Sequence, residues 1–410
     1  MKMNWYIRGM QNIFLRRLFL VITGSKINAG EGDKNMADYI KGVDLSAVAE
    51  VEELGAKYYD NGVQGDIFDI LKNYCVNSVR LRLWNDPYTE DGVPYGAGTN
   101  DLEVYKKLAK RAMDHGMSIL LDYHYSDFWA DPGKQRVPKA WRGMDADQLE
   151  QAVYDYTRET LLEMKDAGVL PQLVQVGNEL TNGLMWPLGQ KPEYDNIAKF
   201  VSAGIRAVRS VDSDIPVMIH LDNGGNNPMY VDWFDNYMER GENFDIIGMS
   251  YYPFWHGTMK ELEANMRDMA DRYGKKIVIA EVSMGFTMED YADYEKLGPD
   301  DRKGYATKPS LVENLDYPMT PEGQAEFMND IMKLIDDVPG GDGFYYWEAG
   351  WIPVPGSGWA TEGALSYIEE SGPCGNEWAN QALFDYDGHA LPALKTIRDY
   401  KPLHSDYPLK

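Results

Sequence analysis

The sequence predicts a single (β/α)8 barrel, the TIM-barrel fold of the α/β class. From residue 39 onward, short apolar runs alternate eight times with longer segments whose apolar residues recur with the period of a helix. Repeated βα units with right-handed crossovers close into such a barrel. An open doubly wound sheet is the alternative, but no strand is followed by a Gly-x-Gly-x-x-Gly turn, and the chain has no Gly-Lys-Ser/Thr phosphate loop. The barrel is therefore favoured.

The predicted strands are short runs rich in Val, Ile, Leu and aromatic residues. In chain order they cover residues 39–44, 78–83, 117–123, 173–177, 216–221, 245–250, 276–280 and 343–347. Helical periodicity predicts one helix after each strand. These helices cover residues 66–74, 102–115, 145–166, 194–211, 231–240, 259–273, 321–337 and 393–400.

Several predicted helix boundaries carry residues that suit them. Thr320 precedes Pro321, so a capping side chain is followed by proline at the first helical position. Gly116 and Gly274 each follow a predicted helix and precede a strand, where a left-handed cap favours glycine. These signals support the alternation independently of its periodicity.

Three of the predicted strand-to-helix loops are unusually long. They follow the third, seventh and eighth strands and cover residues 126–144, 283–319 and 349–391. The usual connection has about 4–6 residues. All three lie on the side of the strand C-termini, where barrel active sites are built. We therefore expect the functional site at that face.

Residues 1–35 differ in composition from the rest of the chain. They hold six Lys or Arg and two acidic residues, and Arg16-Arg17 precede the apolar run 18–22. That order is similar to a secretory signal peptide and predicts a secreted protein. An over-long start or a disordered arm is the alternative. We expect residues 1–35 to form a leader and residues 36–410 to form one catalytic (β/α)8 domain.

The composition argues against several kinds of partner. The 410 residues include 65 Asp or Glu and 40 Lys or Arg, a formal net charge of −25. That charge argues against nucleic acid, anionic membranes and polyanionic polymers. Hydrophobic residues make up 44%, which excludes bulk disorder, and no stretch is apolar for long enough to span a membrane. Cys75 and Cys374 are expected at opposite faces of the barrel and therefore as free thiols.

Acidic residues follow the apolar strands and so are expected at the barrel mouth. They are Asp44, Asp122, Glu179, Asp222, Glu281 and Glu348. Glu179 and Glu281 follow strands four and seven, which face one another across the ring. Two glutamates so placed suit retaining glycoside hydrolysis, in which one carboxyl group protonates the leaving oxygen and the other attacks the anomeric carbon. Structural ion pairing is the competing interpretation, and spacing alone does not choose two acids from six.

Two arginines and two histidines join these acids. Arg80 and Arg82 lie on one face of the second strand, and we expect Arg80 to pair with an acid inside the barrel. Arg82 is nearer the mouth and is expected to orient the nucleophilic carboxylate. His124 and His220 fall at strand ends, but no His-Glu-x-x-His or paired-cysteine pattern accompanies them. Polar contacts to sugar hydroxyls are favoured over a metal site.

Aromatic residues gather at or just after the same strand ends. They are Trp84, Trp129, Tyr251, Tyr252, Trp255, Trp347, Trp351 and Trp359. A flat amphipathic ring suits the C–H face of a sugar, whereas core aromatics would lie at alternating or helical positions inside elements. We expect about half of these rings to face a substrate.

The residues resemble glycoside hydrolase family 53, the arabinogalactan endo-β-1,4-galactanases of clan A. The matching segments are KGVD at 41–44, RLRLWNDP at 80–87, LDYHYSDFWADP at 121–132, QVGNE at 175–179, AE at 280–281, YWE at 346–348, GWA at 358–360 and NQALFD at 380–385. The Asn-Glu pair alone is shared by much of the clan. The segment that ends at 132 and the segment at 381–385 are far more specific.

The resemblance implies a role for each of these residues. Glu179 would be the acid/base and Glu281 the nucleophile of a retaining double displacement on β-1,4-galactan, with Trp347 under the attacked sugar. The predicted substrate-binding residues are Arg82, Trp84, Asp122, His124, Trp129, Asn178, His220, Tyr252, Trp347 and Trp359. Asn178 is expected to hydrogen-bond the sugar 2-hydroxyl. The expected partner is a neutral polysaccharide, the expected assembly a monomer, and no cofactor is required.

The resemblance also raises the question of calcium, which some bacterial relatives bind between the loops after strands seven and eight. The seventh loop of this chain lacks the Asp/Gly/His/Asn-rich stretch associated with that site. Glu289, Asp290 and Asp293 nevertheless supply the hard oxygen ligands that calcium prefers. They are the candidate calcium ligands.

Two other functions compete with the galactanase prediction. Another clan A retaining endo-β-glycanase, acting on mannan or glucan, would share the barrel and the glutamate pair, so only the rim residues discriminate. A non-catalytic sugar-binding barrel would have lost a catalytic acid, and both glutamates are present.

Overall fold

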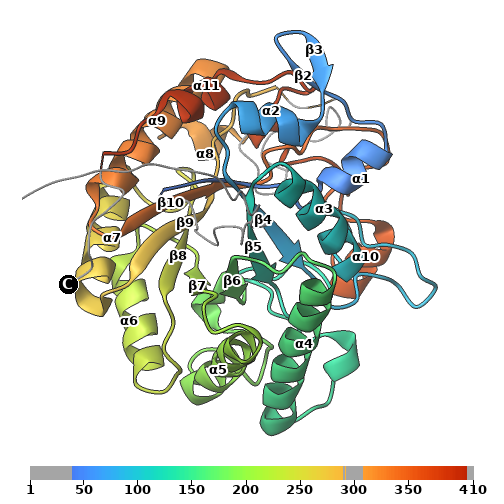
Figure 1. Ribbon diagram of the computed structural model, residues 1–410, viewed down its shortest axis with the longest axis vertical. Coiled ribbons are helices and arrows are strands. Elements are labelled where there is room, and N and C mark those ends of the chain that lie inside the picture. Colours follow the sequence, from blue (N-terminus) through green and yellow to red (C-terminus); the bar gives the residue numbers. More distant parts are fainter. Residues whose placement is uncertain (1–38, 290, 292–307, 404–410) are drawn as a thin grey trace, which may run out of the picture. The chain divides into compact units, whose positions relative to one another are not determined.

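The computed structural model describes residues 39–289, 291 and 308–403 (Figure 1). Its barrel strands are β1 (Ile40–Asp44), β4 (Ser78–Leu83), β5 (Ser118–Tyr123), β6 (Leu173–Val176), β7 (Val217–Leu221), β8 (Ile246–Tyr251), β9 (Lys276–Val282) and β10 (Gly341–Tyr346). They pair in parallel and close in the order β1-β10-β9-β8-β7-β6-β5-β4. The (β/α)8 prediction is confirmed, with every strand within two residues of its predicted ends. The predicted leader, residues 1–35, lies outside the described residues.

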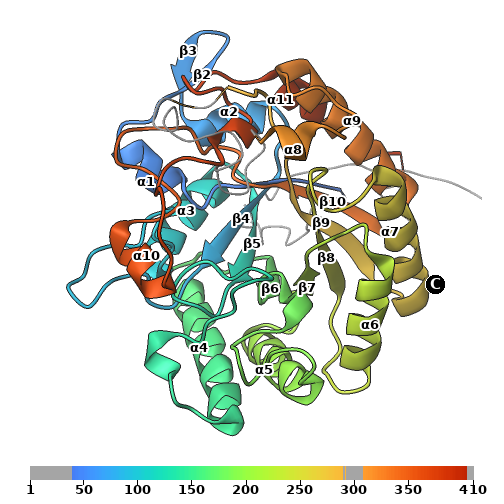
Figure 2. The same cartoon turned by 180° about the vertical axis from the view of Figure 1, so that it is seen from behind.

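Helices surround the strands on the outside of the barrel, as the two opposite views show (Figures 1 and 2). They are α2 (Ile67–Asn73), α3 (Leu102–Asp114), α4 (Ala146–Asp166), α5 (Tyr194–Val211), α6 (Asn227–Met238), α7 (Met259–Tyr273), α9 (Pro321–Asp337) and α11 (Pro392–Asp399). The cap signals are confirmed, because the Thr320 side chain accepts from the Gly323 amide and Gly274 is left-handed at the end of α7. The helix expected from residue 231 begins earlier, since Asn226 caps it and Pro228 lies in its first turn.

Short elements that the sequence analysis did not predict fill the connections. They are α1 (Val48–Glu53), the hairpin β2 (Tyr58–Asp60) and β3 (Val63–Gly65), α8 (Pro309–Val312) and α10 (Glu362–Ile368). Single 3-10 turns also occur at Lys139–Trp141, Leu180–Asn182 and Ala379–Gln381. The three long loops follow β5, β9 and β10 as predicted, and a fourth long connection, residues 84–101, follows β4.

The barrel interior is layered along its axis. Apolar strand side chains form one cluster, separate from the larger core that packs strands against helices. This cluster contains Ile40, Leu120, Leu173, Met218, Ile246, Val278, Ala280 and Tyr345. Two residues further along three of these strands come Asp122, Gln175 and His220. They bind Arg80 of β4 or one another, and all four side chains are fully buried or nearly so. The strand period of two therefore carries each strand from an apolar floor to a polar layer below the mouth.

A register shift in β9 places Glu281 at the mouth. Met249 of β8 pairs with Ile279, but the next residue, Ser250, pairs with Glu281. The extra residue, Ala280, makes a bulge that lets Ala280 face the apolar interior cluster and Glu281 face the cleft. Simple alternation would put these two neighbours on opposite faces.

Two further expectations concern cysteines and membranes. Neither Cys75 nor Cys374 forms a disulfide bond, as predicted. Among the described residues, no helix combines the length and the apolar character needed to cross a membrane.

Candidate active site

A cavity of about 270 Å³ lies at the C-terminal ends of the barrel strands. Nine of the twelve predicted catalytic and substrate-binding residues line it. They are Arg82, His124, Trp129, Asn178, Glu179, Tyr252, Glu281, Trp347 and Trp359. The sequence analysis therefore located the cleft and most of its walls.

The two glutamates face each other across this cleft. One carboxylate oxygen of Glu179 and one of Glu281 lie within 4.8 Å of each other. Gly177 and Glu179 both have positive φ, 85° and 48°, so the chain turns sharply out of β6 at this point. A side chain on Gly177 would collide with Leu180, which is why glycine suits the turn.

The hydrogen-bond partners of the two glutamates differ in charge. Glu281 accepts a hydrogen bond from the Tyr252 hydroxyl at 2.7 Å and pairs with the Arg80 guanidinium at 2.8 Å. Glu179 receives the Ser250 hydroxyl at 2.6 Å. A guanidinium stabilises a carboxylate more than a neutral hydroxyl does. The negative charge is therefore held preferentially on Glu281.

The pKa values follow the same asymmetry. Burial, the nearby Glu281 and then Asp222 raise the pKa of Glu179 well above its ordinary value. Burial also raises the pKa of Glu281, but Arg80 and the Tyr252 hydroxyl oppose that rise. Two carboxyl groups this close do not both ionise readily, and the more strongly raised one keeps the proton. Glu179 is thus the carboxylic acid of the pair and Glu281 the carboxylate.

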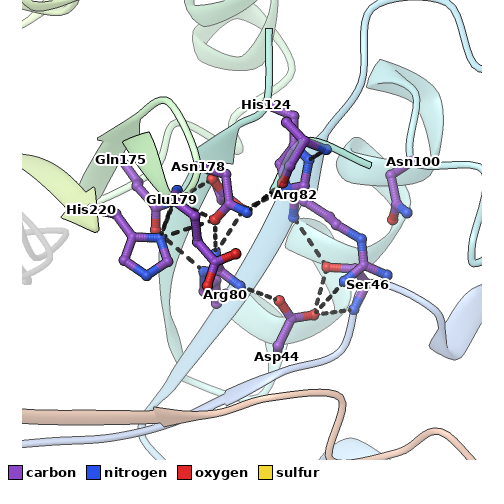
Figure 3. Close-up of polar contacts among 12 residues, drawn as sticks. Asp44, Ser46, Arg80, Arg82, Asn100, His124, Gln175, Asn178, Glu179 and His220 are labelled. Carbon is purple, nitrogen blue, oxygen red and sulfur yellow. Dashed lines mark hydrogen bonds and ion pairs between the residues drawn. The ribbon is translucent and has the colours of Figure 1, made fainter. Parts of the chain in front are cut away.

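Arg80 is the arginine that holds Glu281, which corrects the prediction for Arg82. Arg80 also pairs with Asp44 at 2.9 Å and Asp122 at 2.8 Å, so its predicted ion pairing inside the barrel is confirmed. It donates to the Asn178 side chain as well, as the close-up shows (Figure 3). Because the guanidinium fork has several donors, one buried cation joins four strand ends. The sequence analysis missed this reach into the cleft.

Arg82 lines the cleft but binds other groups. It pairs with Glu348, and its guanidinium carbon lies 4.1 Å from the ring centroid of Trp129. Burial raises the pKa of Glu348 to about 8, although Arg82 opposes that rise. The prediction that Arg82 orients the nucleophile is wrong, because the Arg82 guanidinium lies against Glu348 and the Trp129 ring rather than against Glu281. Arg82 supports an aromatic wall instead.

Three predicted substrate-binding residues lie behind the cleft lining. Trp84 is fully buried and donates through its indole nitrogen to His124 at 3.2 Å. The Asp122 carboxylate contacts Arg80, His124 and Gln175. His220 contacts the Ser250 hydroxyl and has no exposed surface. None of the three lines the cleft. The prediction that they contact the substrate directly is therefore corrected: they lie behind the residues that form the cleft walls.

The cleft also contains eight residues outside the twelve predicted catalytic and substrate-binding residues. They are Arg80, Ala130, Asp131, Lys134, Trp255, Glu370, Glu377 and Trp378. Trp255 was among the rim aromatics. Trp378 lies in the last long loop, where no strand end marks it, and contacts Trp347 at 5.6 Å between ring centroids. Lys134 pairs with Glu370 at 3.2 Å, so two loops meet there.

Two groups of residues offer possible metal ligands. Glu179, His220 and Glu281 bring three possible ligand atoms together. However, His220 Nε2 faces the Ser250 hydroxyl, and Nδ1 faces Asn178 and Gln175, so both ring nitrogens have protein partners. Of the candidate calcium ligands, Asp290 and Asp293 lie outside the described residues. Glu289 is exposed, and no ligand cluster among the described residues includes it.

The fold and the facing carboxyl groups define a class, the (β/α)8-barrel glycoside hydrolases. A buried acid and a buried carboxylate flank a cleft with five tryptophans and a tyrosine in its walls, which suits attack on a sugar linkage. The chain belongs to glycosyl hydrolase family 53, whose sequence pattern matches residues 40–397. The predicted family is confirmed.

Relatives of known structure or name agree with this placement. The chain is 38% identical to an endo-β-1,4-galactanase of Bacillus subtilis over 381 residues, which cover 88% of this chain and 86% of the relative. It is 40% identical to a solved family 53 catalytic domain of Ignisphaera aggregans, with a TM-score of 0.79 and coverage of 88% and 96%. A solved fungal β-1,4-galactanase is 30% identical, with a TM-score of 0.70 and coverage of 88% and 98%.

Proposed function

We propose that this protein hydrolyses internal β-1,4-galactosidic bonds of pectic galactan, the side chains of type I arabinogalactan, with retention of anomeric configuration. The observation that carries the proposal is the pair Glu179 and Glu281, whose oxygens approach within 4.8 Å at the mouth of a family 53 barrel. Retaining enzymes hold their carboxyl groups about 5–5.5 Å apart, whereas inverting enzymes leave room for a water. The separation supports the retaining mechanism.

The reaction divides into two displacements. In the first, Glu281 attacks the anomeric carbon while Glu179 transfers its proton to the leaving oxygen, so the glycosidic bond breaks and a glycosyl ester forms on Glu281. In the second, Glu179, now ionised, removes a proton from water, and that water attacks the same carbon and releases Glu281. Each group ends the cycle in the protonation state in which it began.

The substrate proposal rests on charge and on the relatives. The formal net charge of −25 disfavours the polyanionic backbone of pectin and is compatible with its neutral galactan branches. Two of the relatives named above, the Bacillus subtilis enzyme and the fungal structure, are named as β-1,4-galactanases. Mannan and glucan remain the alternative substrates, because a glutamate pair alone does not distinguish among equatorial and axial hydroxyls.

A reducing-sugar assay on potato galactan, β-mannan and carboxymethylcellulose tests the substrate. Galactan alone should be degraded quickly, into a ladder of short oligosaccharides rather than only galactose. Release of reducing sugar from mannan or carboxymethylcellulose, with none from galactan, would contradict the galactanase proposal. Binding of galactan with no hydrolysis of any polymer would instead favour the sugar-binding barrel.

We further propose that the protein is secreted and monomeric. The basic leader with its short apolar run supports export, since galactan is an extracellular polymer. To test this proposal, the full chain is expressed in a bacterium, and galactanase activity is measured in the periplasm, the medium and the cytoplasm. Activity confined to the cytoplasm would contradict secretion. Size-exclusion chromatography with light scattering should give a mass near 46.6 kDa or slightly less after leader removal.

A further inference from the structure

Two buried side chains lie directly behind Glu179. The Ser250 hydroxyl oxygen is 2.6 Å from Glu179 Oε1, and His220 Nε2 is 2.8 Å from the same hydroxyl. Ser250 and His220 have no exposed surface, and neither lines the cleft. A hydroxyl has one hydrogen, so the direction of this short chain depends on which nitrogen of His220 carries a proton.

The surroundings of the other ring nitrogen settle that question. His220 Nδ1 accepts from the Glu179 backbone amide at 3.4 Å. Gln175 Nε2 lies 3.1 Å from Nδ1, but its two hydrogens are shared with Asp122 Oδ1 at 2.5 Å and the Gly177 carbonyl at 3.1 Å. Asn178 Oδ1 is also near, at 3.0 Å. That oxygen already accepts from Arg80 at 2.9 Å. A backbone amide can only donate, so the Glu179 amide requires an acceptor at His220 Nδ1.

The orientation of Asn178 is itself fixed. Its Nδ2 donates to the Ala130 carbonyl at 2.8 Å while its Oδ1 faces the Arg80 cation, so a flipped amide would lose both bonds. Figure 3 shows Asn178 and Gln175 on one side of the His220 ring. His220 Nδ1 therefore acts as an acceptor, and the proton lies on Nε2.

We propose that His220 and Ser250 are positioning residues that keep the transferable proton of Glu179 on its cleft-facing oxygen. His220 Nε2–H donates to Ser250, which leaves the Ser250 hydrogen free only for Glu179 Oε1. Because Oε1 is an acceptor in both protonation states, the acidic proton sits on Oε2, and after its transfer the same hydroxyl stabilises the new carboxylate. The assignment of Glu179 as acid/base belongs to the proposed function, and this inference deepens it.

Other ionisable groups face this pair and share in its titration. Glu179 is faced by Glu281 of β9, Asp222 after β7 and Asp131 in the loop after β5. His220 is faced by Arg80, Asp122, His124 and His256. All of these are unchanged in a Ser250 variant, so a shift in that variant reports the hydroxyl itself.

The kinetic test compares Ser250→Ala with Ser250→Thr, which restores a hydroxyl. Without the donor the Glu179 carboxylate is less stable, so its pKa rises and the basic limb of the kcat/KM profile moves to higher pH. Turnover of galactan should fall roughly 10-fold, the effect of one hydrogen bond to a charged group. Ser250→Thr should recover both, and Ser210→Ala, at an exposed serine of α5, should change neither. A basic limb that stays in place in Ser250→Ala would overturn the proposal.

A second measurement needs no turnover. Nitrogen NMR of the full chain labelled in histidine reports which ring nitrogen is protonated, with His220 assigned by the signal that His220→Gln lacks. His220 should remain neutral with its proton on Nε2 throughout the active pH range. A proton on Nδ1 would overturn the proposal even if galactan is cleaved, and the predicted tautomer would stand even if galactan proved to be the wrong substrate.

Discussion

At the scale of single residues, the account depends on two glutamates in unequal surroundings. Glu281 lies against the Arg80 cation and the Tyr252 hydroxyl, whereas Glu179 is bound by Ser250 and repelled by Glu281. The first surroundings favour a carboxylate and the second a carboxylic acid. The same residue type therefore provides a nucleophile at position 281 and an acid at position 179.

The first prediction concerns the nucleophile. Glu281→Ala should abolish turnover of galactan, because the group that forms the glycosyl ester is removed, while affinity for galactan stays within a few-fold of the original. Steady-state rates and calorimetric titration with galacto-oligosaccharides measure the two quantities. Glu159→Ala, at an exposed glutamate of α4, is the matched control and should behave as the unaltered chain. Wild-type rates in Glu281→Ala would show that the nucleophile is misassigned.

The second prediction concerns pH. Hydrolysis needs Glu281 ionised and Glu179 protonated, so the rate falls on the acid side as Glu281 gains a proton and on the basic side as Glu179 loses one. Since the pKa of Glu179 is raised well above its ordinary value, the basic limb should lie far above that of a free glutamate. The kcat/KM profile measures both limbs. A profile that rises to a plateau with no basic limb would refute this division of roles.

The sequence predicted which residues lie at strand ends, but it predicted their contacts less well. Position after a strand identified the mouth, and so found Glu179, Glu281 and most of the cleft walls. It did not show that the side chain of Arg80, two residues deeper in β4 than Arg82, is long enough to contact Glu281. Nor did it show that Trp84 would be covered by its neighbours Phe128 and Trp129. Those outcomes depend on side-chain direction and packing, which a single sequence does not record.

At the scale of elements, the strands position the site by their inward alternation. Each carries apolar residues at the floor and polar residues near the mouth, and the bulge at Ala280 turns Glu281 inward. Close packing at the floor leaves no room for additional atoms. The strand β1 shows this most clearly at Gly42.

The third prediction tests that packing. A Cβ at Gly42 would lie within 3.0 Å of the Tyr345 ring and of the Phe344 carbonyl oxygen, so Gly42→Ala should lower the free energy of unfolding by about 1–3 kcal/mol. Urea denaturation followed by tryptophan fluorescence measures the change. Gly65→Ala, where the new atom would make only ordinary contacts with Ile70, is the control and should differ little. Equal stability of the two variants would mean that the floor of the barrel adapts more easily than its geometry indicates.

Long elements were predicted well because their periodicity repeats over many residues. All eight strands and eight helices could be placed from the alternation of apolar residues. The short α1, α10 and the β2–β3 hairpin were missed because a few residues hold too little periodicity to stand out. The bulge in β9 was missed for the same reason, since one inserted residue leaves no pattern.

At the scale of the whole molecule, the length of the chain reflects long loops on one barrel rather than additional domains in the described residues. The long loops after β5 and β10 supply cleft residues, among them Trp129, Lys134, Trp359 and Trp378. The acidic surface and the aromatic cleft together suit a neutral polymer.

The fourth prediction concerns metal ions. Both the acid and the nucleophile are side chains of the protein, so removal of divalent ions with EDTA should leave kcat on galactan unchanged. Rates and the thermal midpoint with EDTA and with added CaCl2 measure the effect. A loss of activity that calcium restores would contradict this expectation and direct attention to Glu289 and its neighbours Asp290 and Asp293.

The most direct test of the central claim is the configuration of the first product. Proton NMR during hydrolysis of β-1,4-galactan resolves the anomeric protons before mutarotation mixes them. Because Glu179 and Glu281 stand close enough for a double displacement, the new reducing ends should appear first as the β-anomer. New ends that appear first as the α-anomer, or galactan that is not cleaved at all, would contradict the account.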